Sequence, residues 1–375
     1  MNRQNISLGR ILGIPIRLDY SWFLIFALLT WSLAASYFPA EFRYWPTPLY
    51  WMVGAATALM MFVSVLLHEL GHSVVAMRYK IVVRRITLFI FGGVAEISSE
   101  PPSAMAEFWI ALAGPAVSFA LAFLFTLLQP MARVAQPSLA LVKYLAYTNA
   151  TLALFNLIPG FPLDGGRIFR AVVWGITHNL GWATIVAANV GRFIAFLFIL
   201  SGVWQIFTGN WGGGLWIAFI GWFLGSAAAS QVQQQTLHDA LAGHRVQQAM
   251  SRNHATVSAD ATLDQLVDHY ILGNGQQSFV VEKSGVPVGW LPASRIRQID
   301  ASAWPTTTAA QVMIPSRQLR RLRPDEDLWD ALEEMERDGA NQMPVMADNQ
   351  VMGLLRKEDV LRYLRTLREF GASAS

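Results

Sequence analysis

The chain has 375 residues, of which 54% are hydrophobic and only 14% are charged. Soluble domains carry about 25% charged residues, so this composition excludes a protein that is soluble throughout. The absence of cysteine excludes disulfides and thiolate metal ligands, and the net charge of +3 gives no reason to expect a nucleic-acid partner. The charges are unevenly distributed: residues 1–237 contain long uncharged runs, whereas residues 238–375 read as an ordinary soluble domain.

The uncharged runs predict about six transmembrane helices, because a helix needs about 20 apolar residues to cross a bilayer. The last run is interrupted by the turn sequence TGNWGGG at 208–214, which separates a fifth span from a sixth. The fifth span contains Arg192, which we expect to extend toward the membrane surface or to face other helices. The first four spans are predicted at residues 20–40, 44–67, 108–132 and 144–163.

Lysine and arginine in the short loops predict the orientation, since these residues accumulate on the cytoplasmic side. Three of them, Arg43, Arg133 and Lys143, lie on one side of the predicted spans. Nine lie on the other side, which also carries the soluble domain. We therefore expect a multi-pass protein of the cell (inner or plasma) membrane with residues 238–375 in the cytoplasm. The nine are Arg3, Arg10, Arg17, Arg78, Lys80, Arg84, Arg85, Arg167 and Arg170.

The sequence FVSVLLHELGHSVVAM, residues 62–77, ends the second predicted span and contains the pattern His-Glu-x-x-His. His68 and His72 are four residues apart, so on a helix they lie on one face and can bind one zinc ion. Glu69 can act as the general base that activates a water molecule at the metal. Packing is the alternative explanation, but these side chains are costly in a membrane helix, and that cost favours a functional site.

A third ligand is expected, because catalytic zinc generally has three protein ligands. The segment NLIPGFPLDGGRIFR, residues 156–170, contains Asp164 before two glycines, and its prolines cannot continue a regular helix. Asp-Gly-Gly is also a common turn. This segment is nevertheless predicted to lie on the same side and at the same depth as the two histidines, which favours Asp164 as a ligand. Asn156 either orients substrate or caps the helix end, and both interpretations stay open.

The apolar segment ITLFIFGGVAEI, residues 86–97, is too short to span a membrane and lies between charged residues. It is predicted to be a re-entrant strand or β-hairpin, which at membrane depth must be buried in protein or line a wet cavity. One hypothesis is that a strand edge here, with Gly92 and Gly93, contacts an unwound substrate segment by main-chain pairing. A hairpin that only fills space within the bundle is the equal alternative.

The soluble domain contains two similar halves, at about 245–300 and 308–370. Met250 precedes Gly289 by 39 residues, and Met313 precedes Gly353 by 40, so the halves form an internal repeat. Each half is predicted to contain a helix, a strand, a turn, a second strand and a final helix.

This α/β pattern resembles a pair of cystathionine-β-synthase (CBS) domains, modules that often bind adenine nucleotides between their halves. In such modules a Ser or Thr three residues before an Asp commonly contacts the nucleotide. Here Arg356 precedes Asp359, so the sequence gives little support for a bound nucleotide. Packing or homodimerisation through the pair is at least as well supported.

The membrane half resembles the site-2 protease family of intramembrane zinc metalloproteases. The resemblance lies in the His-Glu-x-x-His motif at a span end, followed two spans later by Asn156-x-x-Pro159 and Leu163-Asp164-Gly165. LFIFGGVAEI at 88–97 and AGPAVSF at 113–119 extend it. The expected fold is an α-helical polytopic membrane protein of about six transmembrane helices with a small membrane-associated β-hairpin, plus a C-terminal α/β pair of CBS domains.

The resemblance also implies an activity. It implies one Zn²⁺ per chain, bound by His68, His72 and Asp164, with Glu69 as the catalytic base. The substrate would be a membrane protein with a single transmembrane segment, cut within the lipid bilayer and often a regulator. An ion-conducting transporter with a regulatory CBS tail is the alternative class, but an ion path has no need for histidines at i and i+4 with an adjacent glutamate. Intact motifs argue against a catalytically inactive scaffold.

Overall fold

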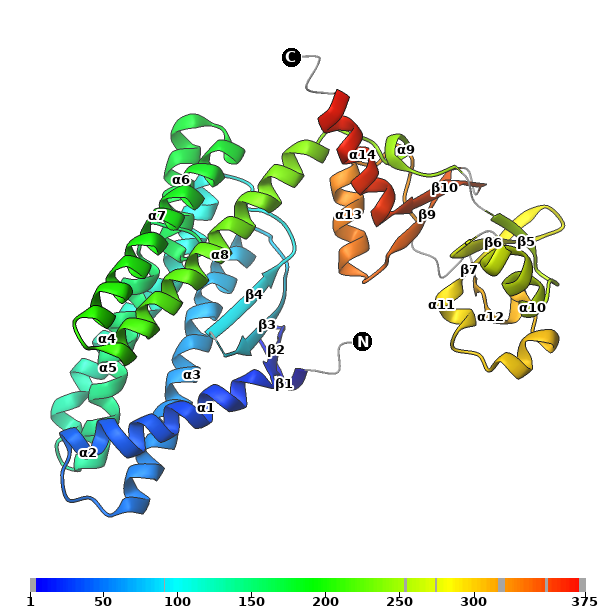
Figure 1. Ribbon diagram of the computed structural model, residues 1–375. Coiled ribbons are helices and arrows are strands. Elements are labelled where there is room, and N and C mark those ends of the chain that lie inside the picture. The colour runs from blue at the N-terminus through cyan, green and yellow to red at the C-terminus, as the bar shows by residue number, and fades with distance from the viewer. Residues whose placement is uncertain are drawn as a thin grey trace. The chain divides into compact units, whose positions relative to one another are not determined.

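The computed structural model describes residues 5–90, 92–252, 255–273, 275–315, 321–347 and 350–370. The chain divides into two compact units, Met1–Gln235 and Thr236–Ser375 (Figure 1). The first contains most of the long apolar helices and the second contains the repeated α/β halves. Each unit is described separately below.

Five helices in the described part of the chain are long and apolar enough to cross a membrane. The first is formed by α1 (Ser21–Ser32), a π-helical turn (Leu33–Tyr37) and α2 (Phe38–Glu41). These five correspond to predicted spans one, two, three, five and six. The other four are α3 (Thr47–Arg78), α4 (Ala104–Ala132), α7 (Leu180–Phe207) and α8 (Trp211–Leu241).

The predicted fourth span, residues 144–163, is helical only as far as Asn156. Helix α5 (Gln136–Asn156) is followed by seven residues outside any helix, and α6 (Asp164–Thr177) then begins. Pro159 and Pro162 lie in this gap, and a proline has no backbone N–H to continue a helix. The described residues thus contain five helices long and apolar enough to cross a membrane, together with the 21-residue α5 in the place of the predicted fourth span, and Asp164 lies at the N-terminus of the next helix.

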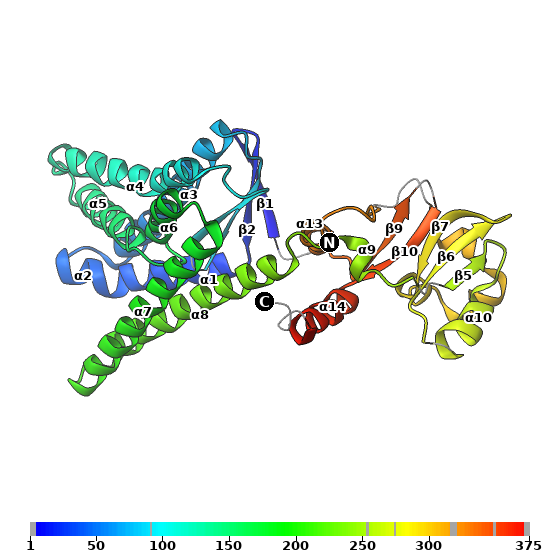
Figure 2. The same cartoon turned by 90° about the horizontal axis from the view of Figure 1, so that it is seen from above.

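A four-stranded sheet lies along one side of the helices of the first unit (Figures 1 and 2). Its order is β1 (Asn5–Ile11), β2 (Ile14–Asp19), β3 (Val83–Phe89) and β4 (Gly92–Ile97). The β3–β4 pair is antiparallel and confirms the predicted hairpin, whereas β2 and β3 are parallel. The position of β4 at the end of this order leaves one of its edges without a partner strand in the sheet.

The N-terminal hairpin formed by β1 and β2 was not predicted, because residues 1–19 read as a polar and basic start. Its second strand alternates buried and half-buried residues, and Ile14 and Ile16 pack with Leu70 of α3, Ile86 of β3 and Ile110 of α4. This shared apolar cluster fixes the sheet against the helix that carries the two histidines.

The second unit contains the two predicted halves. The first half is formed by α9 (Val246–Ala249), β5 (Ala255–Ser258), α10 (Leu263–Leu266) with a π-helical extension (Val267–Leu272), β6 (Ser278–Lys283), β7 (Val286–Pro292), α11 (Ala293–Ile296) and a 3₁₀ helix (Ala301–Thr306). The second half is formed by α12 (Ala309–Val312), β8 (Ile314–Pro315), α13 (Leu328–Arg337), β9 (Gln342–Ala347), β10 (Gln350–Arg356) and α14 (Lys357–Phe370).

The two halves are interlocked. Strand β8 of the second half pairs with β7 of the first, and Ser251 of the first half bridges to Leu354 of the second. A Cβ atom on Gly289 would lie 2.4 Å from the sulfur of Met313, and one on Gly353 would lie 3.2 Å from the sulfur of Met250. The Met and Gly positions that reveal the repeat in the sequence therefore meet in space, each Met packing on the Gly of the other half.

Candidate metal centre

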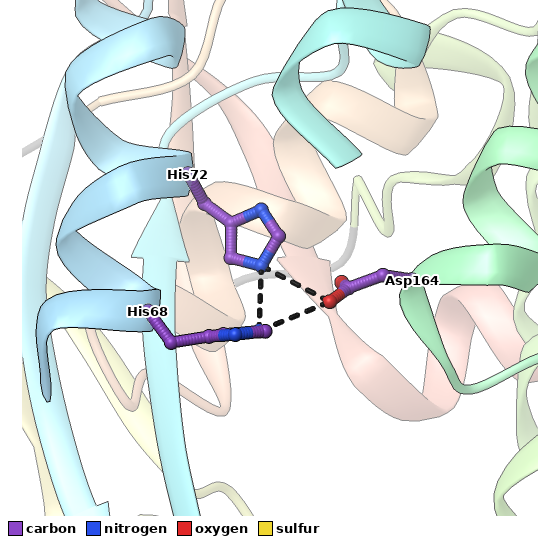
Figure 3. A group of neighbouring side chains, drawn as sticks. All are labelled: His68, His72 and Asp164. Carbon is purple, nitrogen blue, oxygen red and sulfur yellow. Dashed lines mark hydrogen bonds and ion pairs between the residues drawn. The ribbon is translucent and has the colours of Figure 1, made fainter. Parts of the chain in front are cut away.

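Two histidines of α3 and an aspartate that lies far from them in the sequence meet in one group (Figure 3). Nε2 of His68 lies 3.1 Å from Oδ2 of Asp164, and Nε2 of His72 lies 3.2 Å from the same oxygen. The two Nε2 atoms are 3.2 Å apart. The histidines come from one face of α3 and are buried, while the carboxylate arrives from the first residue of α6.

The orientation of the histidine rings leaves Nε2 available as a ligand atom. Nδ1 of His72 lies 2.7 Å from the carbonyl oxygen of Ile110, and a carbonyl can only accept, so this nitrogen carries the proton. In a neutral imidazole Nε2 then has a free lone pair. Nδ1 of His68 is held 2.9 Å from the hydroxyl of Ser118. Hydrogen bonds of this kind on the outer nitrogen are typical of histidines that bind metals.

The spacing of the three atoms fits a tetrahedral ion. Ligands bound to zinc at about 2.0–2.1 Å in tetrahedral geometry lie about 3.3 Å apart, and the observed separations are 3.1–3.2 Å. With a neutral His72, the Nε2 lone pair faces a carboxylate oxygen, an arrangement that a cation between them stabilises. Two imidazoles and one carboxylate are also a donor set that zinc prefers. The residues present therefore fit the ion.

Gly114 of α4 lies directly against the two histidines. A Cβ atom at this position would be 2.1 Å from Nε2 of His72 and 2.6 Å from Nε2 of His68. Glycine is therefore required here by space rather than by backbone conformation. In the sequence this glycine belongs to the motif AGPAVSF, residues 113–119, and no neighbouring residue indicates that it lies at the metal centre.

Close backbone packing fixes the position of Asp164. A Cβ atom on Gly165 would lie 2.3 Å from the carbonyl of Leu157, and one on Gly166 would lie 2.3 Å from the carbonyl carbon of Gly160. The non-helical segment before α6 therefore lies tightly against the first turn of that helix.

Glu69 lies on the sheet side of the group. A Cβ atom on Gly93 of β4 would lie 2.5 Å from Cγ of Glu69, so Gly93 provides the space for this side chain. Gly92 has φ of 128° and nothing close to its missing Cβ, so its role here is to allow the turn into β4.

The other candidate residues are placed as follows. Asn156 is the last residue of α5 and half-buried, and the described contacts include no side-chain cap at this helix end. His178, the third histidine of residues 1–237, ends α6 in the left-handed conformation and is not part of the metal group. Both roles considered for Asn156 remain predictions.

Comparisons with known proteins agree with this geometry. The family model described as "Peptidase family M50" matches residues 56–135 and 130–200, and the model described as "CBS domain" matches residues 309–366. Rip3 of Mycobacterium tuberculosis, named "Putative zinc metalloprotease", is 35% identical over 98% of this chain and 94% of its own. The chain belongs to peptidase family M50. This is the site-2 protease family that the sequence motifs resemble, and the C-terminal CBS domain is confirmed with it.

Other M50 relatives extend over the same length. The Synechocystis protein sll0528, with the same descriptive name, is 32% identical over 96% of each chain. "Zinc metalloprotease MJ0392" of Methanocaldococcus jannaschii is 26% identical over 97% of each. The solved site-2 protease from M. jannaschii covers 61% of this chain and 95% of its own, with 29% identity and a TM-score of 0.43. This M50 chain is thus an integral membrane protein with relatives named as zinc metalloproteases.

Proposed function

We propose that this M50 chain is an intramembrane zinc endopeptidase that hydrolyses a peptide bond in or near the transmembrane segment of a membrane-bound regulatory protein. The position of Glu69 carries the proposal. Glu69 directly follows the ligand His68 on α3, and its side chain lies against Gly93 of β4, the last strand in the order of the sheet. A general base must lie within reach of both the metal centre and the substrate.

Each residue of the group has a separate task in this proposal. His68, His72 and Asp164 would hold the ion, and zinc would supply Lewis acidity and lower the pKa of a water molecule to about 7. Glu69 would take a proton from that water and deliver it to the leaving amine. Asn156, at the end of α5, would hydrogen-bond the substrate carbonyl oxygen as negative charge develops on it.

The free edge of β4 is proposed to bind the substrate as an added strand. A peptidase needs an extended chain, and an edge strand can supply main-chain hydrogen bonds to one. Gly93 of β4 lies against the side chain of Glu69, so this strand lies next to the proposed base. Val94→Pro should abolish cleavage and leave bound zinc unchanged, whereas Val94→Ala should cleave normally. Equal cleavage by the two variants would leave β3–β4 as a structural hairpin only.

The orientation and the tail complete the proposal. We propose that residues 238–375 lie in the cytoplasm, as the loop charges predict, and that the tail acts through packing or dimerisation rather than through a nucleotide. Asp359 is 5% exposed, and its carboxylate lies 3.8 Å from Nε of Arg356, so a charged partner within the chain already faces it. Adding ATP, ADP or AMP to the full chain should leave its melting temperature unchanged. A concentration-dependent rise with any of them would contradict this assignment.

The deciding experiment compares the purified wild type with Glu69→Ala on a single-span membrane substrate. We expect about one zinc per chain in both proteins and cleavage only in the wild type. His68→Ala and Asp164→Ala should lose zinc as well as cleavage. Cleavage by Glu69→Ala would refute the assigned mechanism, and chelator-insensitive cleavage would refute the metal. Ion flux in vesicles without cleavage would indicate a transporter instead.

A further inference from the structure

A buried ion pair joins α6 to α4 outside the group of metal ligands. Nε of Arg170 donates to Oε1 of Glu107 at 2.7 Å, and Nη2 of the same arginine donates to the same oxygen. Glu107 is fully buried and Arg170 is 6% exposed. The loop-charge count treated Arg170 as a cytoplasmic surface residue, but the structure places it inside the first unit.

Arg170 also contacts two further parts of that unit. Its Nη1 lies 3.4 Å from the hydroxyl of Thr184 on α7, and its guanidinium carbon lies 5.2 Å from the ring centre of Phe161. Phe161 is three residues before Asp164, in the non-helical segment. One arginine therefore contacts α4, α7 and the segment that leads into the third ligand.

Stability alone is a poor explanation for this pair. Taking two charges out of water costs several kcal/mol per ion, and that cost is recovered only when the remaining polar atoms are hydrogen-bonded. Oε2 of Glu107 is buried without a hydrogen-bond partner among the described residues. An apolar pair of similar volume would serve packing equally well, so the feature that the ion pair adds is a fixed geometry.

We propose that Arg170 and Glu107 are positioning residues that set the place of Asp164 at the metal centre. Helix α6 begins at Asp164, and six residues of helix separate it from Arg170, about 9 Å of rigid backbone. Fixing Arg170 against α4 therefore fixes the start of α6. Helix α4 carries Gly114 and Ser118, which contact the two histidines. The ion pair therefore fixes the third ligand relative to the same helix that contacts the two histidine ligands.

This inference rests on the proposed metal site, and the experiment separates the two. Zinc affinity is measured by chelator competition for the full-length wild type, Glu107→Gln and Arg170→Lys, with the cobalt spectrum as a second readout. We expect Kd to rise about 10- to 100-fold in both variants, as for other residues that orient metal ligands, and the cobalt absorption to change. A wild type without zinc would refute the metal site itself, whereas unchanged variants would refute the positioning role only.

Two further variants distinguish positioning from a general loss of structure. In Glu107→Leu/Arg170→Met, packing replaces the charges, so we expect wild-type melting behaviour but still weakened zinc binding. In an Asp164→Ala background, Glu107→Gln should have no additional effect on the weak metal binding that His68 and His72 retain at high zinc concentration, because the ligand that it positions is absent. Wild-type zinc affinity in the double variant, or an equal effect with and without Asp164, would overturn the proposal. Lys143→Met, which breaks the exposed ion pair with Glu41, is the matched control and should bind zinc normally.

Discussion

Replacing Gly114 by alanine should remove zinc from an otherwise folded protein. The added Cβ would lie 2.1 Å from Nε2 of His72, and ordinary contact begins at 3.4 Å, so this nitrogen must move by about 1.3 Å or α4 must withdraw from α3. Metal–ligand distances tolerate deviations of only about 0.2 Å. We therefore expect zinc affinity to fall at least about 100-fold, which corresponds to about 2.7 kcal/mol.

The assay is zinc content and competition affinity of the purified variant, with the melting temperature of the metal-free protein measured in parallel. Gly175→Ala is the control, because it lies in helix α6 and its Cβ would meet only the Cβ of Ala104 at 3.7 Å. That change should keep zinc and stabilise the fold by about 0.5–1 kcal/mol. Gly114→Ala protein with wild-type zinc affinity would refute the geometric reasoning.

Three other predictions concern the same centre. Gly93→Ala should displace Glu69, so zinc content should stay at the wild-type level while the cleavage rate falls; a normal rate would show that Glu69 does not depend on this space. Ser118→Ala removes the hydroxyl that holds His68, and zinc Kd measured by competition should rise about 10- to 100-fold. Removing zinc with a chelator should lower the unfolding free energy by about 4 kcal/mol if the ion had been present at 1,000 times its Kd, and differential scanning calorimetry should show the reversal when zinc is returned.

The metal centre could be predicted largely from the sequence because its signals are local. The four-residue spacing of His68 and His72 places both on one helical face, and Asp164 sits in a segment whose prolines forbid a continuous helix. The membrane class followed from the uncharged runs, and the CBS pair from the repeated spacing of Met and Gly. Each of these inferences needed only neighbouring residues or an internal comparison.

The features that could not be predicted depend on contacts between distant segments. Strand β2 pairs with β3, which lies about 70 residues later in the sequence. The alternating apolar residues Ile14 and Ile16 therefore could not be assigned to a sheet from the neighbouring sequence. Gly114 acquires its importance only where α4 crosses α3. Arg170 was counted as a loop charge because its partner Glu107 lies 63 residues earlier in the sequence. In each case the local sequence is compatible with several environments, and packing selects one.

The non-helical segment 157–163 lies within the membrane domain, where its backbone amides need hydrogen-bond partners. His68 is ten residues before the end of α3, about 15 Å along the helix, so the neighbouring segment 157–163 lies well below the helix end. Unpaired backbone donors at such depth would cost several kcal/mol each. All five amides in this segment donate to carbonyl oxygens within the first unit, and the two remaining residues are prolines, which have no amide. Pro159 and Pro162 thus end the helix without leaving a donor to hydrate, and replacing either would introduce one next to the third ligand.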